Sequence, residues 1–132
     1  MAKGAYRVLI VDDDDVSRAL IEMSLVRYNI KASSAADGAI ALELLQRETF
    51  DLLITDIVLP EADGYEVIQN AQRWQPDIKI LAVSGGDHKR LPSGLALDVA
   101  AKMGIDGALA KPFTPDELIH AVEAIRHPPR PK

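Results

Sequence analysis

The chain alternates five short apolar runs with five longer segments whose apolar residues recur with the period of a helix. The apolar runs occupy residues 6–11, 30–35, 51–56, 78–84 and 107–111. The helical segments occupy residues 15–29, 37–48, 63–74, 95–103 and 114–126. Strands that are apolar throughout are typical of a parallel sheet covered by helices on both faces. We therefore predict an α/β fold with a doubly wound, five-stranded parallel sheet.

The helical segments carry local signals for their starts and their faces. At the last segment, Thr114 is the predicted N-cap, Pro115 takes the first helical position and Glu117 completes a capping box. In the first segment, one face is marked by side chains at helical spacing, namely Val16, Leu20, Met23 and Arg27, with Ala19 and Val26 nearby. In the second segment, the side chains predicted to point inward are Ile40, Leu44 and Leu45.

Size and charge narrow the class of protein. The 132 residues are 48% hydrophobic, which suits one globular domain with a substantial core, and the absence of cysteine excludes disulfides and thiolate metal sites. The net charge is −5 and the basic residues are scattered, whereas direct nucleic-acid binding needs a concentrated basic face. No apolar stretch approaches the roughly 20 residues of a membrane span, and no signal-peptide core precedes the first acidic run. We therefore expect a cytoplasmic protein without membrane insertion or direct contact with nucleic acid.

Polar side chains stand where four of the predicted strands end. They are two aspartates after the first strand, then an aspartate, a serine and a lysine at the later strands, namely Asp12, Asp13, Asp56, Ser84 and Lys111. Open α/β sheets bind ligands at the carboxyl ends of their strands, so we expect these side chains to share one site. Carboxylate oxygens suit a hard divalent cation, and we predict Mg²⁺. A lysine and a hydroxyl opposite the cation are suitable contacts for a phosphoryl group.

The first of these strands ends in four consecutive aspartates, residues 12–15. Two carboxylates about 5 Å apart repel by roughly 3 kcal/mol at an effective dielectric constant near 20. A bound cation would offset this cost for Asp12 and Asp13. For Asp14 and Asp15 we favour a solvated turn and a helix N-cap.

Four segments closely resemble the receiver domain of two-component response regulators. They are "VLIVDDDDVSR", "LLITDIVLPEADG", "ILAVSG" and "ALAKPFTPDEL", and the resemblance extends from about Arg7 to Arg126. It implies a receiver domain over residues 1–127, followed by a proline-rich tail over 128–132. It also implies a flavodoxin-like (βα)5 fold with strand order 2-1-3-4-5, which the alternation of strands and helices alone does not decide.

The resemblance implies a role for each acidic residue of the site. Asp56 would be the phosphoacceptor, which attacks the phosphohistidine of a histidine kinase and becomes an aspartyl phosphate. Asp13, Asp56 and the backbone carbonyl of Val58 would coordinate Mg²⁺ directly. Asp12 would act on the cation largely through a bound water.

The remaining implied roles concern the fourth and fifth strands. Lys111 would pair with the phosphoryl oxygens, and its bond to Pro112 resembles the cis peptide of the family. Ser84 would move to hydrogen-bond the phosphoryl group. The chain departs from the family at Ala108, where a tyrosine or phenylalanine often stands, and in the long segment 84–94. We hypothesise that this segment replaces the missing aromatic residue as the element that phosphorylation orders.

The expected function is a phosphorylation-controlled switch, or a shuttle in a phosphorelay, that catalyses only its own phosphorylation and dephosphorylation. Its phosphodonor would be a histidine kinase or a phosphotransfer protein. The resemblance implies an output face for a downstream protein, made of segments 95–103, 107–111 and 114–126, and a homodimer is a further compatible state.

Two alternatives remain open at this point. One is a receiver-like docking module that is never phosphorylated. The other is a phosphatase of the haloacid-dehalogenase type with Asp12 as nucleophile and Asp14 as acid and base, which would leave Asp56 and "KPF" unexplained.

Overall fold

The computed structural model describes residues 6–57, 64–84 and 101–127 and contains one five-stranded sheet. The strands are β1 (Arg7–Val11), β2 (Lys31–Ala35), β3 (Leu52–Asp56), β4 (Lys79–Ser84) and β5 (Gly107–Ala110). The helices are α1 (Asp15–Val26), α2 (Gly38–Arg47), α3 (Gly64–Trp74) and α5 (Pro115–Arg126). All strand pairs are parallel and the order is β2-β1-β3-β4-β5, so the predicted fold class and strand order are confirmed. Most of the helix predicted at 95–103, and the tail at 128–132, lie outside the described residues.

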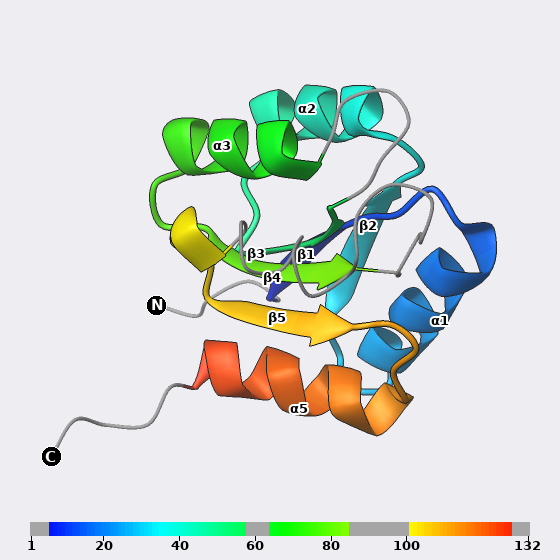
Figure 1. Cartoon of the computed structure of the whole chain (residues 1–132). Coiled ribbons are helices and arrows are strands. Elements are labelled where there is room, and N and C mark those ends of the chain that lie inside the picture. The colour runs from blue at the N-terminus through cyan, green and yellow to red at the C-terminus, as the bar shows by residue number, and fades with distance from the viewer. Residues whose placement is uncertain (1–5, 58–63, 85–100, 128–132) are drawn as a thin grey trace, which may run out of the picture.

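The helices cover the sheet on both faces, with α2 and α3 on one side and α1 and α5 on the other (Figure 1). Strand β1 contributes side chains to the hydrophobic core on both faces of the sheet. Val8 and Ile10 belong to the core beneath α1 and α5, whereas Leu9 and Val11 belong to the core beneath α2 and α3. All four side chains are fully buried, which explains why the strand is apolar without alternation.

Helix α1 ends earlier than predicted. The expected range was 15–29, but the helix stops at Val26 and the chain turns through Asn29, whose φ of 59° lies in the left-handed region. Asparagine tolerates this conformation better than most residues and commonly ends helices in this way. The backbone N–H of Ile30 then donates to the carbonyl of Leu25, which returns the chain toward β2.

The buried face of α1 is formed by Ile21, Ser24 and Leu25, and the face marked by Val16 and Met23 is exposed. The hydroxyl of Ser24 donates to the carbonyl of Leu20, so a polar residue is accommodated in the buried stripe. Helix α1 therefore carries two apolar stripes, of which only one packs against the sheet.

In α2, the predicted inward position of Ile40 is wrong, because 45% of this residue is exposed. The buried stripe contains Ala41 and Leu45, and Leu44 is partly buried. Small and apolar side chains four residues apart thus face the sheet, whereas Ile40 lies on the outer side of the first turn. In α5, the capping box of Thr114 and Glu117 is present, as predicted.

The two stripes of α1 should respond differently to truncation. Leu25→Ala is expected to lower the free energy of unfolding by about 2–5 kcal/mol, because it opens a cavity in the core. Met23→Ala is expected to change it by less than about 0.5 kcal/mol, because this side chain is largely exposed. Urea unfolding of both variants measures the difference, and equal costs would contradict the observed rotation of α1.

Candidate functional site

The carboxyl ends of four adjacent strands bring the predicted side chains to one edge of the sheet. Asp12 directly follows β1 and Asp56 is the last residue of β3. Ser84 ends β4 and is opposite Ala110 in the register with β5. The N–H of Lys111 donates to the carbonyl of Ser84 at 2.9 Å, which extends this pairing by one residue.

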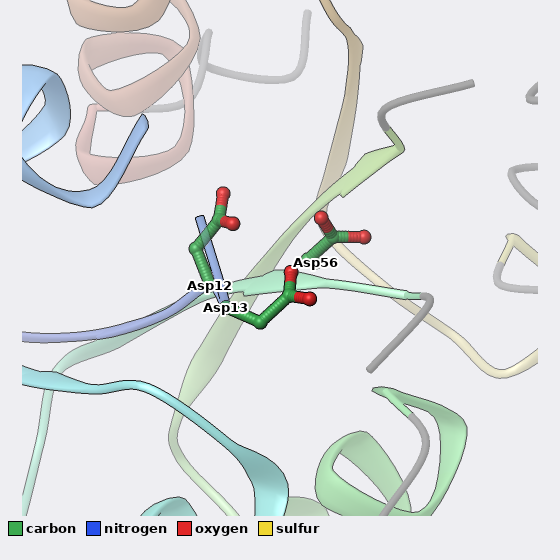
Figure 2. Close-up of side chains that lie close together, drawn as sticks. All are labelled: Asp12, Asp13 and Asp56. Atoms are coloured by element: carbon green, nitrogen blue, oxygen red, sulfur yellow. The ribbon is translucent and has the colours of Figure 1, made fainter. Parts of the chain in front are cut away.

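Three carboxylates form the centre of this edge (Figure 2). Asp12, Asp13 and Asp56 each offer one oxygen, and these oxygens lie within 4.8 Å of one another. Asp12 is fully buried and Asp56 is 5% exposed, whereas Asp13 is exposed. The cluster is therefore held by the protein on one side and open to solvent on the side of Asp13.

The ammonium of Lys111 bridges two of these carboxylates. Its Nζ lies 2.6 Å from Oδ2 of Asp12 and 2.9 Å from Oδ2 of Asp56, and 15% of the side chain is exposed. Burial alone lowers the pKa of Lys111, but hydrogen bonds and charges from both aspartates outweigh this effect and raise the pKa above its ordinary value. The lysine is thus a fixed positive charge beside Asp12 and Asp56, and its peptide bond to Pro112 is cis.

The next two aspartates have separate local partners. Asp14 is the N-cap of α1 and accepts a hydrogen bond from the N–H of Ser17. Hydrogen bonding from the side chain of Ser17, and then from its backbone, lowers the pKa of the Asp14 carboxyl group. Asp15 pairs with the guanidinium of Arg18 at 2.5 Å. Asp14 and Asp15 therefore have partners outside the carboxylate cluster, and the predicted N-cap is confirmed at Asp14.

Two residues that support this edge were not identified from the sequence. Arg18 donates from one guanidinium nitrogen to the backbone carbonyl of Asp12 at 2.9 Å. Gly64, the first residue of α3, donates its N–H to the carbonyl of Ile57 at 2.8 Å. A spacing of three residues between Asp15 and Arg18 indicates an ion pair on a helix, but it does not predict the contact with Asp12.

Several predicted features lie outside the described residues. They are the carbonyl of Val58 and all but the first residue of the segment 84–94. Ala108 is described, and it pairs with Ala82 in the register of β4 and β5. Within the described ranges, no helix is both long and apolar enough to cross a membrane.

The chain is similar to known proteins in sequence and in fold. The chain is 34% identical over 118 residues to the response regulator receiver protein CpdR of Brucella abortus (strain 2308), covering 89% of this chain and 93% of that protein. A CheY-like response regulator receiver domain protein from Methanospirillum hungatei JF-1 matches with a TM-score of 0.82 and 27% identity, over 93% of this chain and 95% of that chain.

A third similar structure is a response regulator protein from Burkholderia pseudomallei, solved with a phosphorylated aspartic acid, a calcium ion and citrate. It matches with a TM-score of 0.75 and 26% identity, over 92% of this chain and 75% of that chain. The family model of the response regulator receiver domain matches residues 8–123. The chain therefore belongs to the receiver domains of two-component response regulators.

Proposed function

We propose that the chain is a signalling switch that accepts a phosphoryl group on Asp56 from a histidine kinase or a phosphotransfer protein. The observation that carries this proposal is the position of the Asp56 carboxylate, which shares the ammonium of Lys111 with Asp12 and lies beside Asp13. The phosphorylated aspartic acid of the similar Burkholderia pseudomallei protein supports the same chemistry. A cytoplasmic location is part of the proposal.

The chemistry of the three carboxylates fits Mg²⁺. This cation prefers oxygen ligands and is usually held by one or two carboxylates together with substrate phosphate oxygens. Asp13 and Asp56 would hold it directly, Asp12 would act through water, and the carbonyl of Val58 would complete the protein ligands. When bound, Mg²⁺ supplies positive charge that offsets the charge of the entering phosphoryl group.

The chain's own residues can then carry out the transfer. A carboxylate oxygen of Asp56 attacks phosphorus, the bond between phosphorus and the donor nitrogen breaks, and the donor imidazole keeps the electron pair. Lys111, which is already beside Asp56, neutralises charge on the phosphoryl oxygens. Ser84, which is 1% exposed at the end of β4, is the proposed hydrogen-bond donor to the transferred group.

The exposed stripe of α1 supports a protein phosphodonor with a helical docking surface. Val16, Leu20 and Met23 are 76%, 36% and 68% exposed and follow one another at intervals of four and three residues. This spacing forms a seam against which another helix can pack side by side. Helix α1 begins directly after residues 12–14, the acidic loop that follows β1. A helix packed on this seam would therefore end close to Asp56.

The output of the switch is proposed to pass through β5, α5 and the preceding helical segment to a downstream protein. Of this face, β5 and α5 belong to the described part of the chain.

Intact-mass spectrometry after incubation with acetyl phosphate tests the proposal. The wild type with Mg²⁺ should gain one phosphoryl group, and both EDTA and Asp56→Asn should abolish the gain. Asp51→Asn is the matched control, because Asp51 lies before β3 and its side chain accepts from the N–H of Arg7, a bond that an amide oxygen can keep. This control should be phosphorylated like the wild type.

Two results would contradict the proposal. Binding of Mg²⁺ without any phosphoryl gain would favour the docking module. Sustained hydrolysis of p-nitrophenyl phosphate, lost in Asp12→Asn, would favour the phosphatase.

A further inference from the structure

Arg18 ties the acidic loop to α1 through two contacts. One guanidinium nitrogen donates to the backbone carbonyl of Asp12 at 2.9 Å, and the other lies 2.5 Å from a carboxylate oxygen of Asp15. The side chain is 19% exposed, whereas that of Asp15 is 87% exposed. Arg18 therefore lies folded against the loop, although it occupies the first turns of a surface helix.

The carbonyl that Arg18 holds belongs to the peptide joining Asp12 to Asp13. A peptide unit is planar, so fixing its oxygen also fixes the N–H of Asp13 and the direction in which the chain enters Asp13. A second contact acts on the same loop, because the N–H of Asp14 donates to Oδ1 of Asp12 at 2.9 Å. Two hydrogen bonds thus restrain the backbone that carries Asp12 and Asp13, two of the three clustered carboxylates.

We propose that Arg18 is a positioning residue for the cation site. Its guanidinium holds the peptide between Asp12 and Asp13, and thereby sets these carboxylates at the spacing that a divalent cation requires. This inference rests on the proposed function, since it assumes that the three carboxylates bind Mg²⁺. Arg18 itself contributes no ligand atom.

Geometry and charge predict opposite effects for the loss of Arg18. If only its charge mattered, removing a positive group near three carboxylates would strengthen Mg²⁺ binding. If its hydrogen bonds position the loop, removal should weaken Mg²⁺ binding by about tenfold, the lower end of the range for residues that orient metal ligands. A lysine retains the charge but cannot reproduce the two-pronged geometry of a guanidinium.

The experiment measures Mg²⁺ affinity by isothermal titration calorimetry for the wild type, Arg18→Gln and Arg18→Lys. Both variants are expected to bind Mg²⁺ about tenfold more weakly than the wild type. Arg27→Gln is the control for charge, since Arg27 is exposed and directly follows α1 at the end remote from the loop. Its Mg²⁺ affinity should change by less than about twofold, because exposed charges at long range are screened. Tighter binding in Arg18→Gln with unchanged binding in Arg18→Lys would overturn the proposal.

A second measurement separates this inference from the proposed function. In EDTA, the amide proton of Asp14 is expected to exchange about tenfold faster in Arg18→Gln than in the wild type, because the loop opens more often. Unchanged exchange would overturn the positioning role whether or not Mg²⁺ binds. Failure of the wild type to bind Mg²⁺ would instead refute the metal part of the proposed function, and with it a role of Arg18 in a cation site.

Discussion

Replacing Lys111 with methionine is expected to lower the free energy of unfolding by about 3–5 kcal/mol in Mg²⁺-free buffer. The wild-type ammonium lies 2.6 and 2.9 Å from two carboxylates whose side chains are 0% and 7% exposed, those of Asp12 and Asp56. Methionine has a similar length but no charge, so the two buried carboxylates would lose the ammonium that they share. Urea unfolding in EDTA measures the cost.

The matched control is Lys79→Met, which removes the same charge from the surface. Nζ of Lys79 lies 4.0 Å from Asp106, and the two side chains are 54% and 33% exposed. Exposed pairs of this kind contribute about 0–1 kcal/mol. Equal costs for Lys111→Met and Lys79→Met would mean that the Lys111 bridge is as weak as a surface ion pair.

Mg²⁺ should restore part of the stability that Lys111→Met loses. A ligand that binds only the folded state stabilises it in proportion to the logarithm of its concentration over its dissociation constant. Without the ammonium, the carboxylate cluster is more negative and should bind the cation more tightly. The gain in unfolding free energy on adding Mg²⁺ is therefore expected to be larger for Lys111→Met than for the wild type. Its phosphorylation by acetyl phosphate should nevertheless be slower by roughly 10²–10³-fold, because a stabiliser of transferred charge is missing.

The strand pattern predicted the sheet and most of the site for one physical reason. Strands buried on both faces must be apolar throughout, and their polar residues can then stand only at the ends. Asp56 after "LLIT" in the fully buried strand β3 is an example. Lys111 follows β5, whose residues are partly buried or exposed, and its place at the same edge comes from the parallel pairing with β4. Because the carboxyl ends of parallel strands lie at the same edge of the sheet, residues that directly follow different strands come together in one site. The strand order came from the family resemblance, since five strands of similar composition do not identify their neighbours.

The rotation of α1 could not be chosen from periodicity. Val16, Leu20 and Met23 form one apolar stripe, and Ile21 and Leu25 form another. Both stripes satisfy the helical period, and only packing against β1, β2 and α5 selects the second.

The supporting contacts of the site depend on the path of the backbone rather than on residue pattern. Arg18, which lies in the first turns of α1, donates to the carbonyl of Asp12, two residues before the N-cap Asp14. A backbone acceptor leaves no signature in the sequence, so this contact could be found only in the structure. Gly64 likewise could not be identified from the sequence, because the need for glycine there comes from the nearby backbone atoms of Asp56 and Ile57.

Gly64→Ala is expected to cost about 3 kcal/mol of unfolding free energy, at the upper end of the usual range for overpacking. A Cβ at this position would lie 2.3 Å from the carbonyl oxygen of Asp56 and 2.5 Å from Cα of Ile57. Both neighbours are backbone atoms, which cannot rotate away as a flexible side chain could. The start of α3 or the end of β3 must therefore move. Because Asp56 belongs to that backbone, phosphorylation by acetyl phosphate should slow by about 10²-fold even in molecules that fold.

Gly104→Ala separates this close approach from the general cost of replacing a glycine. Gly104 has a φ of +80°, and the nearest atom that a Cβ there would meet is Nε2 of Gln72 at 3.9 Å. Alanine there should cost about 1–2 kcal/mol through backbone strain alone. It should leave the rate of phosphorylation unchanged, because the new methyl group would face a side chain of α3 rather than the backbone of Asp56. If Gly64→Ala proved as stable as Gly104→Ala and were phosphorylated at the wild-type rate, contact between α3 and the backbone of Asp56 would not be what positions the Asp56 carboxylate. We expect a large loss of both stability and phosphorylation for Gly64→Ala alone. This result would mean that the backbone of α3 determines the position of Asp56.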